Sequence, residues 1–189
     1  FPGLTIETER QLHYERHAAV RAYARANGLD RILVSGDRDR VGIISAGKSA
    51  ADLRQALGDL GLGRADDLRR AGIRVLQMGL IYPIDPEIVR RFAEPLDEVI
   101  VIEEKRGFLE AQVKEALSGR AIRVVGKFDE TGVTPLFPIQ AGLDADIVAE
   151  RLGPRLLGAL GGALGGAPGD AHEGIERRLA ELRAIRGRR

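Results

Sequence analysis

Residues 42–49 read GIISAGKS, which fits the G-x-x-x-x-G-K-S/T pattern of nucleotide-binding P-loops. In a P-loop the glycines allow successive backbone N–H groups to surround the phosphates, after the preceding strand has ended. Here the apolar run 41–46 is the only candidate strand, and it places Gly42 inside the strand. Ile43 and Ile44 are stiff, β-branched residues that suit a strand better than such a loop. A P-loop-like nucleotide-binding protein that uses Gly42–Ser49 is therefore an alternative that the spacing does not favour.

A smaller site remains compatible with the same segment. Gly47, Lys48 and Ser49 follow the predicted strand and open a helix. Backbone N–H groups at a helix N-terminus, together with an ammonium group, can hold an anion or a carboxylate of a neighbouring domain. The simpler interpretation, which we favour, is a tight turn at Gly47, a helix cap at Ser49 and a solvated Lys48.

A second group of charged residues ends the apolar strand 98–103. Its members are Glu103, Glu104, Lys105 and Arg106. The carboxyl edge of an α/β sheet is where binding sites usually lie, so these residues are candidates for charged contacts with an adjoining domain. A solvated strand end is the alternative, with surface ion pairs worth about 0–1 kcal/mol each. Gln112 lies near the apolar side of the next helix, where its amide either pins the strand-end loop or stays partly in water.

No catalytic group and no metal site is predicted in this chain. The absence of cysteine excludes disulfides, thiolate metal sites and iron–sulfur clusters within it. His13 and His17 are spaced i, i+4, but no third ligand converges on them, so we interpret them as part of a solvated helix face. The formal net charge of +1 gives no basic excess for nucleic acid or a membrane surface. With no signal peptide and no spanning apolar run, a cytoplasmic protein is expected.

Strands alternate with helices along most of the sequence. The predicted strands are 31–35, 41–46, 73–79, 98–103 and 121–126. The predicted helices are 7–27, 49–60, 107–117 and one that starts at Asp85-Pro86-Glu87. This alternation predicts a three-layer α/β/α fold with a mostly parallel sheet and flanking helices.

The predicted organisation has four parts. Residues 1–30 form a lead-in amphipathic helix, 31–152 the α/β domain, 153–171 a Gly/Ala-rich linker, and 172–189 an amphipathic helix that leads to a missing domain. The Leu and Ala content of the linker also allows a frayed helix there. The last helix has an apolar stripe of Ile175, Leu179, Leu182 and Ile185, which packs on another domain, on another chain or back onto this one. The start at Phe1 suggests a piece of a longer protein.

Four segments together resemble one family. They are VGIISAGKSAADLRQAL (41–57), MGLIYPIDPEIVRRFAE (78–94), VIVIEEKRGFLEAQVKEAL (99–117) and VVGKFDETG (124–132). In this order they are similar to the middle domain of indolepyruvate:ferredoxin oxidoreductases, a branch of the 2-oxoacid:ferredoxin oxidoreductase family. The block from Glu103 to Gln112 is the most specific part of the resemblance, and ARANGLD (24–30) resembles the segment that leads in.

The resemblance implies a transketolase C-terminal-like fold inside a larger enzyme. That enzyme uses thiamine diphosphate and Mg²⁺ to decarboxylate aryl-2-oxoacids oxidatively to acyl-CoA, with CoA as co-substrate. Its electrons pass through 4Fe–4S clusters to ferredoxin. The diphosphate-binding motif Gly-Asp-Gly and the cluster cysteines do not occur in this sequence.

The resemblance therefore implies a non-catalytic domain without a cofactor of its own, which packs against thiamine-binding domains of the same polypeptide. It also implies a homodimeric parent protein, with no nucleic-acid or membrane partner. A plain α/β interaction module that self-associates through residues 173–185 is a further alternative.

Overall fold

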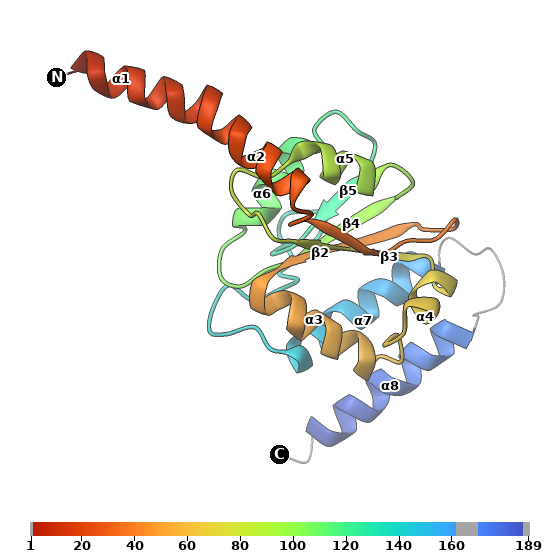
Figure 1. Cartoon of the computed structure of the whole chain (residues 1–189). Coiled ribbons are helices and arrows are strands. Elements are labelled where there is room, and N and C mark those ends of the chain that lie inside the picture. Colours follow the sequence, from red (N-terminus) through yellow and green to blue (C-terminus); the bar gives the residue numbers. More distant parts are fainter. Residues whose placement is uncertain (1, 162–169, 187–189) are drawn as a thin grey trace.

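Five strands form one sheet in a computed structural model, which describes residues 2–161 and 170–186 (Figure 1). They are β1 (Arg31–Val34), β2 (Val41–Ala46), β3 (Ile73–Met78), β4 (Glu98–Ile102) and β5 (Arg123–Val125). The order across the sheet is β1-β3-β2-β4-β5, and all pairs are parallel except β1 with β3. The prediction of a mostly parallel sheet is confirmed, with one antiparallel strand at its edge.

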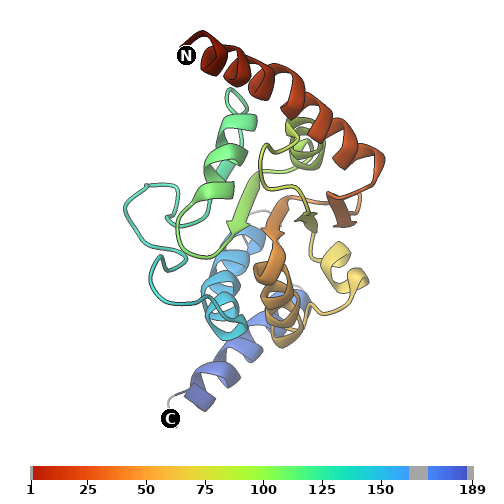
Figure 2. The same ribbon diagram turned by 60° about the vertical axis from the view of Figure 1, so that its left-hand side comes forward.

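Helices cover both faces of the sheet, as Figures 1 and 2 show. One face carries α3 (Gly47–Asp59), α4 (Ala65–Arg70), α7 (Ala145–Gly161) and α8 (Asp170–Arg186). The other face carries α5 (Pro86–Ala93) and α6 (Phe108–Ala116). The predicted three-layer α/β/α fold class is confirmed. The short helix α4 was not predicted.

Each face of the sheet has its own hydrophobic core, because successive strand residues point to opposite sides. Ile43 packs with Leu53 in the cluster under α3 and α7, whereas the next residue, Ile44, packs with Phe92 in the cluster under α5 and α6. All five residues of β4 are buried, as expected for a strand covered on both faces.

The N-terminal lead-in is one continuous helical segment made of α1 (Pro2–Gln11), a π-helical turn (Leu12–Arg16) and α2 (His17–Ala26). Its first half extends away from the sheet, whereas α2 is fixed near α5 (Figure 1). Arg21 Nε donates to the carbonyl of Ile84 at 2.9 Å, and Arg25 Nη1 donates to Asp85 Oδ1 at 3.0 Å. Asp85 also accepts from the backbone N–H of Glu87 at 3.2 Å, so the predicted start of α5 is confirmed.

The helix α7 extends into residues 153–171, which we predicted as a linker. It continues through Pro154 because tertiary packing outweighs the lost backbone hydrogen bond: Leu152 and Leu156 on either side are fully buried. The boundary at 153 is therefore wrong for the first part of the segment. Residues 162–169 lie outside the described residues.

The apolar stripe of α8 packs back onto this chain. Ile175 is fully buried and Leu179 nearly so, in the same core as α7. The contact is close, since a Cβ atom on Gly153 of α7 would lie 2.8 Å from Leu179 Cδ2. Ile185 at the end of the stripe remains exposed. Of the three predicted positions for this helix, the structure therefore selects the one within the chain.

Candidate functional site

The segment 42–49 does not have P-loop geometry. β2 runs to Ala46 and α3 begins at Gly47, so no loop separates the strand from the helix. Gly42 lies within β2, where a Cβ atom would be 2.4 Å from Leu96 Cδ1 and 2.6 Å from Phe92 Cε1. Position 42 thus has no room for a side chain, because α5 and the loop after it pack tightly on the sheet. The close approach of a phosphate is not needed to explain this glycine.

The carboxyl ends of β2, β3 and β4 surround an open groove of about 640 Å³. Its lining includes all the predicted strand-end residues: Gly47, Lys48, Ser49, Glu103, Glu104, Lys105 and Arg106. Parallel strands end at one edge of a sheet, so residues more than fifty positions apart meet here. Gln112 does not line this groove and lies further along α6.

Lys48 is held by its own chain. Its Nζ donates to Asp52 Oδ2 at 2.7 Å and to the carbonyl of Leu143 at 2.6 Å, and lies 3.6 Å from Glu104 Oε1. The hydrogen bond to Asp52 raises the pKa of Lys48. The Lys48 side chain is 60% exposed, as the prediction of a solvated lysine requires. The prediction did not include its contacts, through which the ammonium group ties α3 to the segment before α7.

The other two residues of this segment shape the turn into α3. Gly47 has a φ of +53°, which confirms the predicted tight turn. Ser49 is buried in the first turn of α3, and the helix has no side-chain cap. The prediction of a cap at Ser49 is wrong, because the strand enters the helix directly and the N-cap position falls on Ala46.

Glu103 forms the cap of α6. Its carboxylate accepts three backbone N–H bonds: Oε2 from Phe108 at 3.1 Å and Leu109 at 2.8 Å, and Oε1 from Glu110 at 2.9 Å. A negative charge at a helix N-terminus is favourable because these N–H groups have no partner within the helix. Glu103 is therefore a structural residue of this edge.

Glu104 and Lys105 both contact the segment that precedes α7. Glu104 Oε1 accepts from the backbone N–H of Leu143 at 3.3 Å, and Lys105 Nζ donates to the carbonyl of Ala141 at 2.6 Å. Lys105 and Ala141 have φ values of +56° and +57°, a region that non-glycine residues rarely adopt. The strand end and this segment thus hold each other in an unusual backbone conformation.

Arg106 differs from its neighbours. It is exposed, and its side chain makes no hydrogen bond or ion pair with the residues described. Ile81 (46% exposed) and Phe108 (51%) line the groove together with Arg106, and the exposed ring of Tyr82 (54%) contacts that of Phe108. We call these four residues the edge patch. The Tyr82 and Phe108 rings are 6.0 Å apart.

Gln112 fixes the loop that carries part of the edge patch. Its Nε2 donates to the carbonyls of Ile81 at 2.9 Å and Phe108 at 3.3 Å, and its Oε1 accepts from the N–H of Ile84 at 3.4 Å. The amide does pin a loop at a strand end, but it is the loop that follows β3 and not the predicted one after strand 98–103. The Gln112 side chain is also half-buried, so the two alternatives were not exclusive.

Two buried charges behind the groove were not predicted. Glu110 Oε2 accepts from the backbone N–H of Lys127 at 2.8 Å, and Oε1 accepts from Lys114 Nζ at 2.6 Å. The Lys127 ammonium donates to the carbonyls of Glu103 and, at 3.3 Å, of Pro138. Burial lowers the pKa of Lys127, although Glu103 and Glu110 act in the opposite direction.

The sequence contained one signal for these buried charges. Glu110 is three residues before Val113, hence on the apolar side of α6. Lys127 lies in GKFDETG (126–132), where the glycines and polar residues by themselves indicate only a turn.

Lys127 gives the chain a predictable pH dependence. Since its pKa in the folded chain lies below the ordinary value of 10.5, folding disfavours the charged form. This penalty is fully present below both pKa values, and it is relieved as the pH rises through the folded pKa toward that of the unfolded chain.

The free energy of unfolding of the wild type, relative to Lys127→Met, is therefore expected to increase across this alkaline window. Urea unfolding of both proteins at a series of pH values measures it, and a difference that stays flat with pH would contradict the assignment.

Within residues 2–161 and 170–186, no group of three or more His, Asp or Glu side chains is arranged to hold a metal ion. His13 and His17 contact each other edge-to-face, with ring centroids 5.2 Å apart, and His17 also contacts Tyr82. None of the helices in the same ranges is long and apolar enough to cross a membrane.

The sequence matches a family model described as "Indolepyruvate oxidoreductase domain" over residues 26–186. The chain therefore belongs to the indolepyruvate oxidoreductase domain family. The resemblance read from the four segments is confirmed by this match.

Curated relatives of this indolepyruvate oxidoreductase domain include two archaeal proteins named indolepyruvate oxidoreductase subunit IorA. The one from Thermococcus kodakarensis is 28% identical over 92 residues, and the one from Pyrococcus abyssi is 30% identical over 92 residues. Each match covers 48% of this chain and 13% of the relative, so the chain spans only a small part of these subunits.

Two solved structures are similar to this domain. One is a split gene transketolase, an inactive β4 tetramer, with a TM-score of 0.47, 26% identity, and coverage of 71% of this chain and 42% of that chain. The other is 2-oxoglutarate:ferredoxin oxidoreductase from Magnetococcus marinus, with a TM-score of 0.46, 19% identity, and coverage of 67% and 19%.

Proposed function

We propose that this chain is a non-catalytic α/β domain of a thiamine-diphosphate-dependent indolepyruvate (aryl-2-oxoacid):ferredoxin oxidoreductase. In this proposal it packs against the thiamine-binding domains of the same polypeptide through the carboxyl edge of its sheet. The observation that carries the proposal is the edge patch, in which Ile81, Tyr82 and Phe108 expose apolar surface beside Arg106. Aromatic and arginine side chains are enriched in the buried parts of protein interfaces.

The contacts of the other charged residues support a structural role for this edge. Glu103 is engaged with the N-terminus of α6, and Glu104 and Lys48 with the segment before α7. Acid–base chemistry needs groups that can reach a substrate proton. Here the acids hold backbone N–H groups of their own chain, so the edge is better suited to hold a fixed shape against another domain.

The residues of this chain do not fit thiamine diphosphate and its metal ion. The carboxylates of the groove, Glu103 and Glu104, accept hydrogen bonds from backbone N–H groups. We therefore assign thiamine diphosphate, Mg²⁺, the 4Fe–4S clusters and CoA to other parts of the parent enzyme. The ferredoxin partner, the homodimeric state and the cytoplasmic location belong to the same proposal.

Neither alternative function accounts for the structure as well. A nucleotide-binding P-loop needs a loop between its strand and its helix. In this chain β2 ends at Ala46 and α3 begins at Gly47, so that loop does not exist here. An interaction module that self-associates through residues 173–185 needs the apolar stripe of that helix, but Ile175 and Leu179 are already buried in the chain's own core.

Calorimetric titration of the 189-residue chain into the remainder of the parent polypeptide, produced without this domain, tests the proposal. We expect a 1:1 complex, and a loss of at least about tenfold in affinity, or 1.4 kcal/mol, for Phe108→Gln. The matched control is Val133→Gln, because Val133 is also exposed (77%) but does not line the groove. Its affinity should equal that of the wild type. No complex, or equal losses in both variants, would contradict docking through the edge patch.

A further inference from the structure

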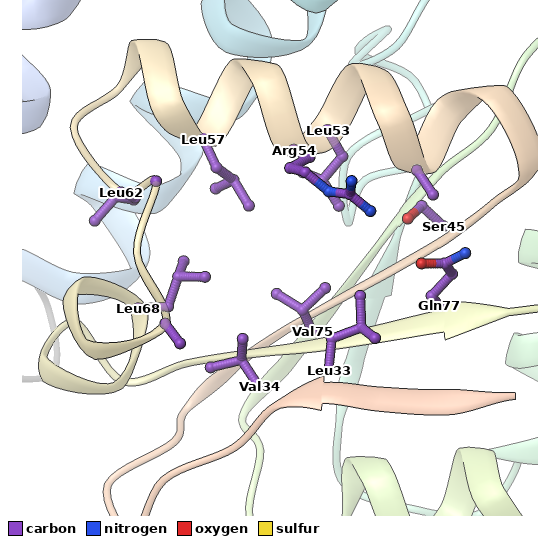
Figure 3. Close-up of a pocket in the computed structure, with 13 residues that line it drawn as sticks. Leu33, Val34, Ser45, Leu53, Arg54, Leu57, Leu62, Leu68, Val75 and Gln77 are labelled. Atoms are coloured by element: carbon purple, nitrogen blue, oxygen red, sulfur yellow. The ribbon is translucent and has the colours of Figure 1, made fainter. Parts of the chain in front are cut away.

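A separate pocket of about 190 Å³ lies on the α3 face of the sheet, beside the edge strand β1 (Figure 3). Its walls come from α3, α4, the segment between these two helices, and strands β1 to β3. Most of the lining is aliphatic, and its main members are Val34, Leu53, Leu57, Leu62, Leu68 and Val75. A mostly apolar pocket with few polar groups is the usual form of a small-molecule site.

The polar lining is confined to one end of this pocket. Ser45 of β2 and Gln77 of β3 are direct neighbours in the parallel sheet. They lie on the same face of the sheet as the apolar pair Ile43 and Val75, which precedes them by two residues on each strand. The Arg54 guanidinium, from α3, is directed toward the same end (Figure 3).

These polar groups have no partners in the described part of the chain. The side chains of Ser45, Gln77 and Arg54 form no hydrogen bond or ion pair with it, although Ser45 is only 1% exposed. The Ser45 hydroxyl and the Gln77 amide, which line one end of the pocket, therefore keep hydrogen-bonding capacity for a ligand that enters it.

We infer that this pocket binds a small monocarboxylate with a compact apolar group, of about the size of a phenyl ring. The guanidinium of Arg54 matches a carboxylate in charge and planar geometry, and the Ser45 hydroxyl and Gln77 amide supply further donors. The volume fits the apolar part, since a cavity of roughly 150 Å³ lined by aliphatic residues binds benzene. Among the described residues that line the pocket there is no acidic side chain and no histidine, so the lining offers a carboxylate a cationic partner without a competing anion.

This site is distinct from the carboxyl-edge groove. Ser45 and Gln77 face α3, whereas the adjacent Ala46 and Met78 contribute to the groove. The inference concerns a ligand of this chain itself, so it does not rest on the proposed docking to other domains.

Titration of the ¹⁵N-labelled chain with benzoate and with its neutral isostere benzamide, followed by amide chemical shifts, tests the inference. We expect saturable shifts at Ser45, Val75 and Gln77, with benzoate bound more tightly than benzamide. Arg54→Gln should weaken benzoate at least about fivefold, on the order of 1 kcal/mol, and leave benzamide unchanged. The control Arg151→Gln alters an exposed arginine of α7 outside the pocket and should bind both ligands as the wild type does.

A second variant keeps the test independent of the charge. Ala65 is exposed at the rim, so Ala65→Phe is expected to fold normally and to block entry of both ligands. The inference would be overturned by chemical shift changes that do not saturate or that occur elsewhere on the chain. It would also be overturned if neither Arg54→Gln nor Ala65→Phe weakened the binding of benzoate. Failure of both ligands to bind would also overturn it, and would favour a side chain of a neighbouring domain as the occupant.

Discussion

Replacing Gly126 by alanine is expected to lower the free energy of unfolding by about 3–5 kcal/mol, the cost of disrupting a buried charged network. A Cβ atom on Gly126 would lie 2.4 Å from Glu110 Oε2 and 2.6 Å from Glu110 Cδ. The carboxylate cannot withdraw without losing the N–H of Lys127 or the ammonium of Lys114, at 2.8 and 2.6 Å. Because Glu110 is only 6% exposed, water cannot replace these partners. Urea unfolding measures the loss.

Two companion variants separate this clash from a general effect of alanine. Gly58→Ala adds a methyl group to open space in α3 and should stabilise the chain by about 0.5–1 kcal/mol. In a Glu110→Ala background the added methyl at Gly126 no longer meets a carboxylate, so its cost should fall below about 1 kcal/mol. A cost that is the same in both backgrounds would show that Glu110 is not the group displaced.

The overall fold could be predicted because its signals are local. The sequence Asp85-Pro86-Glu87 places a capping carboxylate, a proline and an acid at the first turn of α5, and each suits a helix start by itself. The C-terminal boundary could not be predicted in the same way. Pro154 and the glycines after it indicate a linker, but the burial of Leu152 and Leu156 decides the outcome, and burial depends on the whole domain.

The candidate site was predictable in position but not in its contacts. Strand ends of a parallel sheet gather at one edge, which is enough to bring Lys48 and Glu104 together. Their partner, the backbone of Leu143, lies 95 residues from Lys48, and no local pattern indicates such a contact. That Gln112 pins a loop was predictable, because an amide near the apolar side of a helix must find partners, but which loop it pins was not.

Buried ion pairs recur at the opposite edge of the sheet, near the amino ends of the strands. Glu98 at the start of β4 is 1% exposed and accepts from Arg155 Nε of α7 at 2.6 Å. Asp39, just before β2, accepts from Arg74 Nε of β3 at 2.7 Å. Since a buried charge without its partner is strongly unfavourable, these pairs fix how the helices and strands join. A single substitution disrupts the Asp39–Arg74 pair more easily, because Asp39 has only one ion-pair partner in the described chain.

Arg74→Gln is expected to lower the free energy of unfolding by about 3–5 kcal/mol, because it leaves a buried carboxylate without a counter-charge. The Asp39 side chain is 0% exposed, and its Oδ2 accepts from Arg74 Nε and from the backbone N–H of Gly36, each at 2.7 Å. Its Oδ1 has no hydrogen-bond partner among the described residues, so nothing nearby can compensate. Urea unfolding at neutral pH measures the loss.

The double variant Asp39→Asn with Arg74→Gln decides whether the unpaired charge is the cause. With the charge removed, more than half of the lost stability should return, since two neutral amides are far less costly to bury. The control Arg70→Gln removes an arginine that is 72% exposed and pairs with Asp67 at the surface, and it should cost less than about 1 kcal/mol. Arg74 Nη1 also donates to the carbonyl of Phe92 at 3.2 Å. Equal losses in the single and double variants would therefore assign the cost to that backbone contact and not to the carboxylate of Asp39.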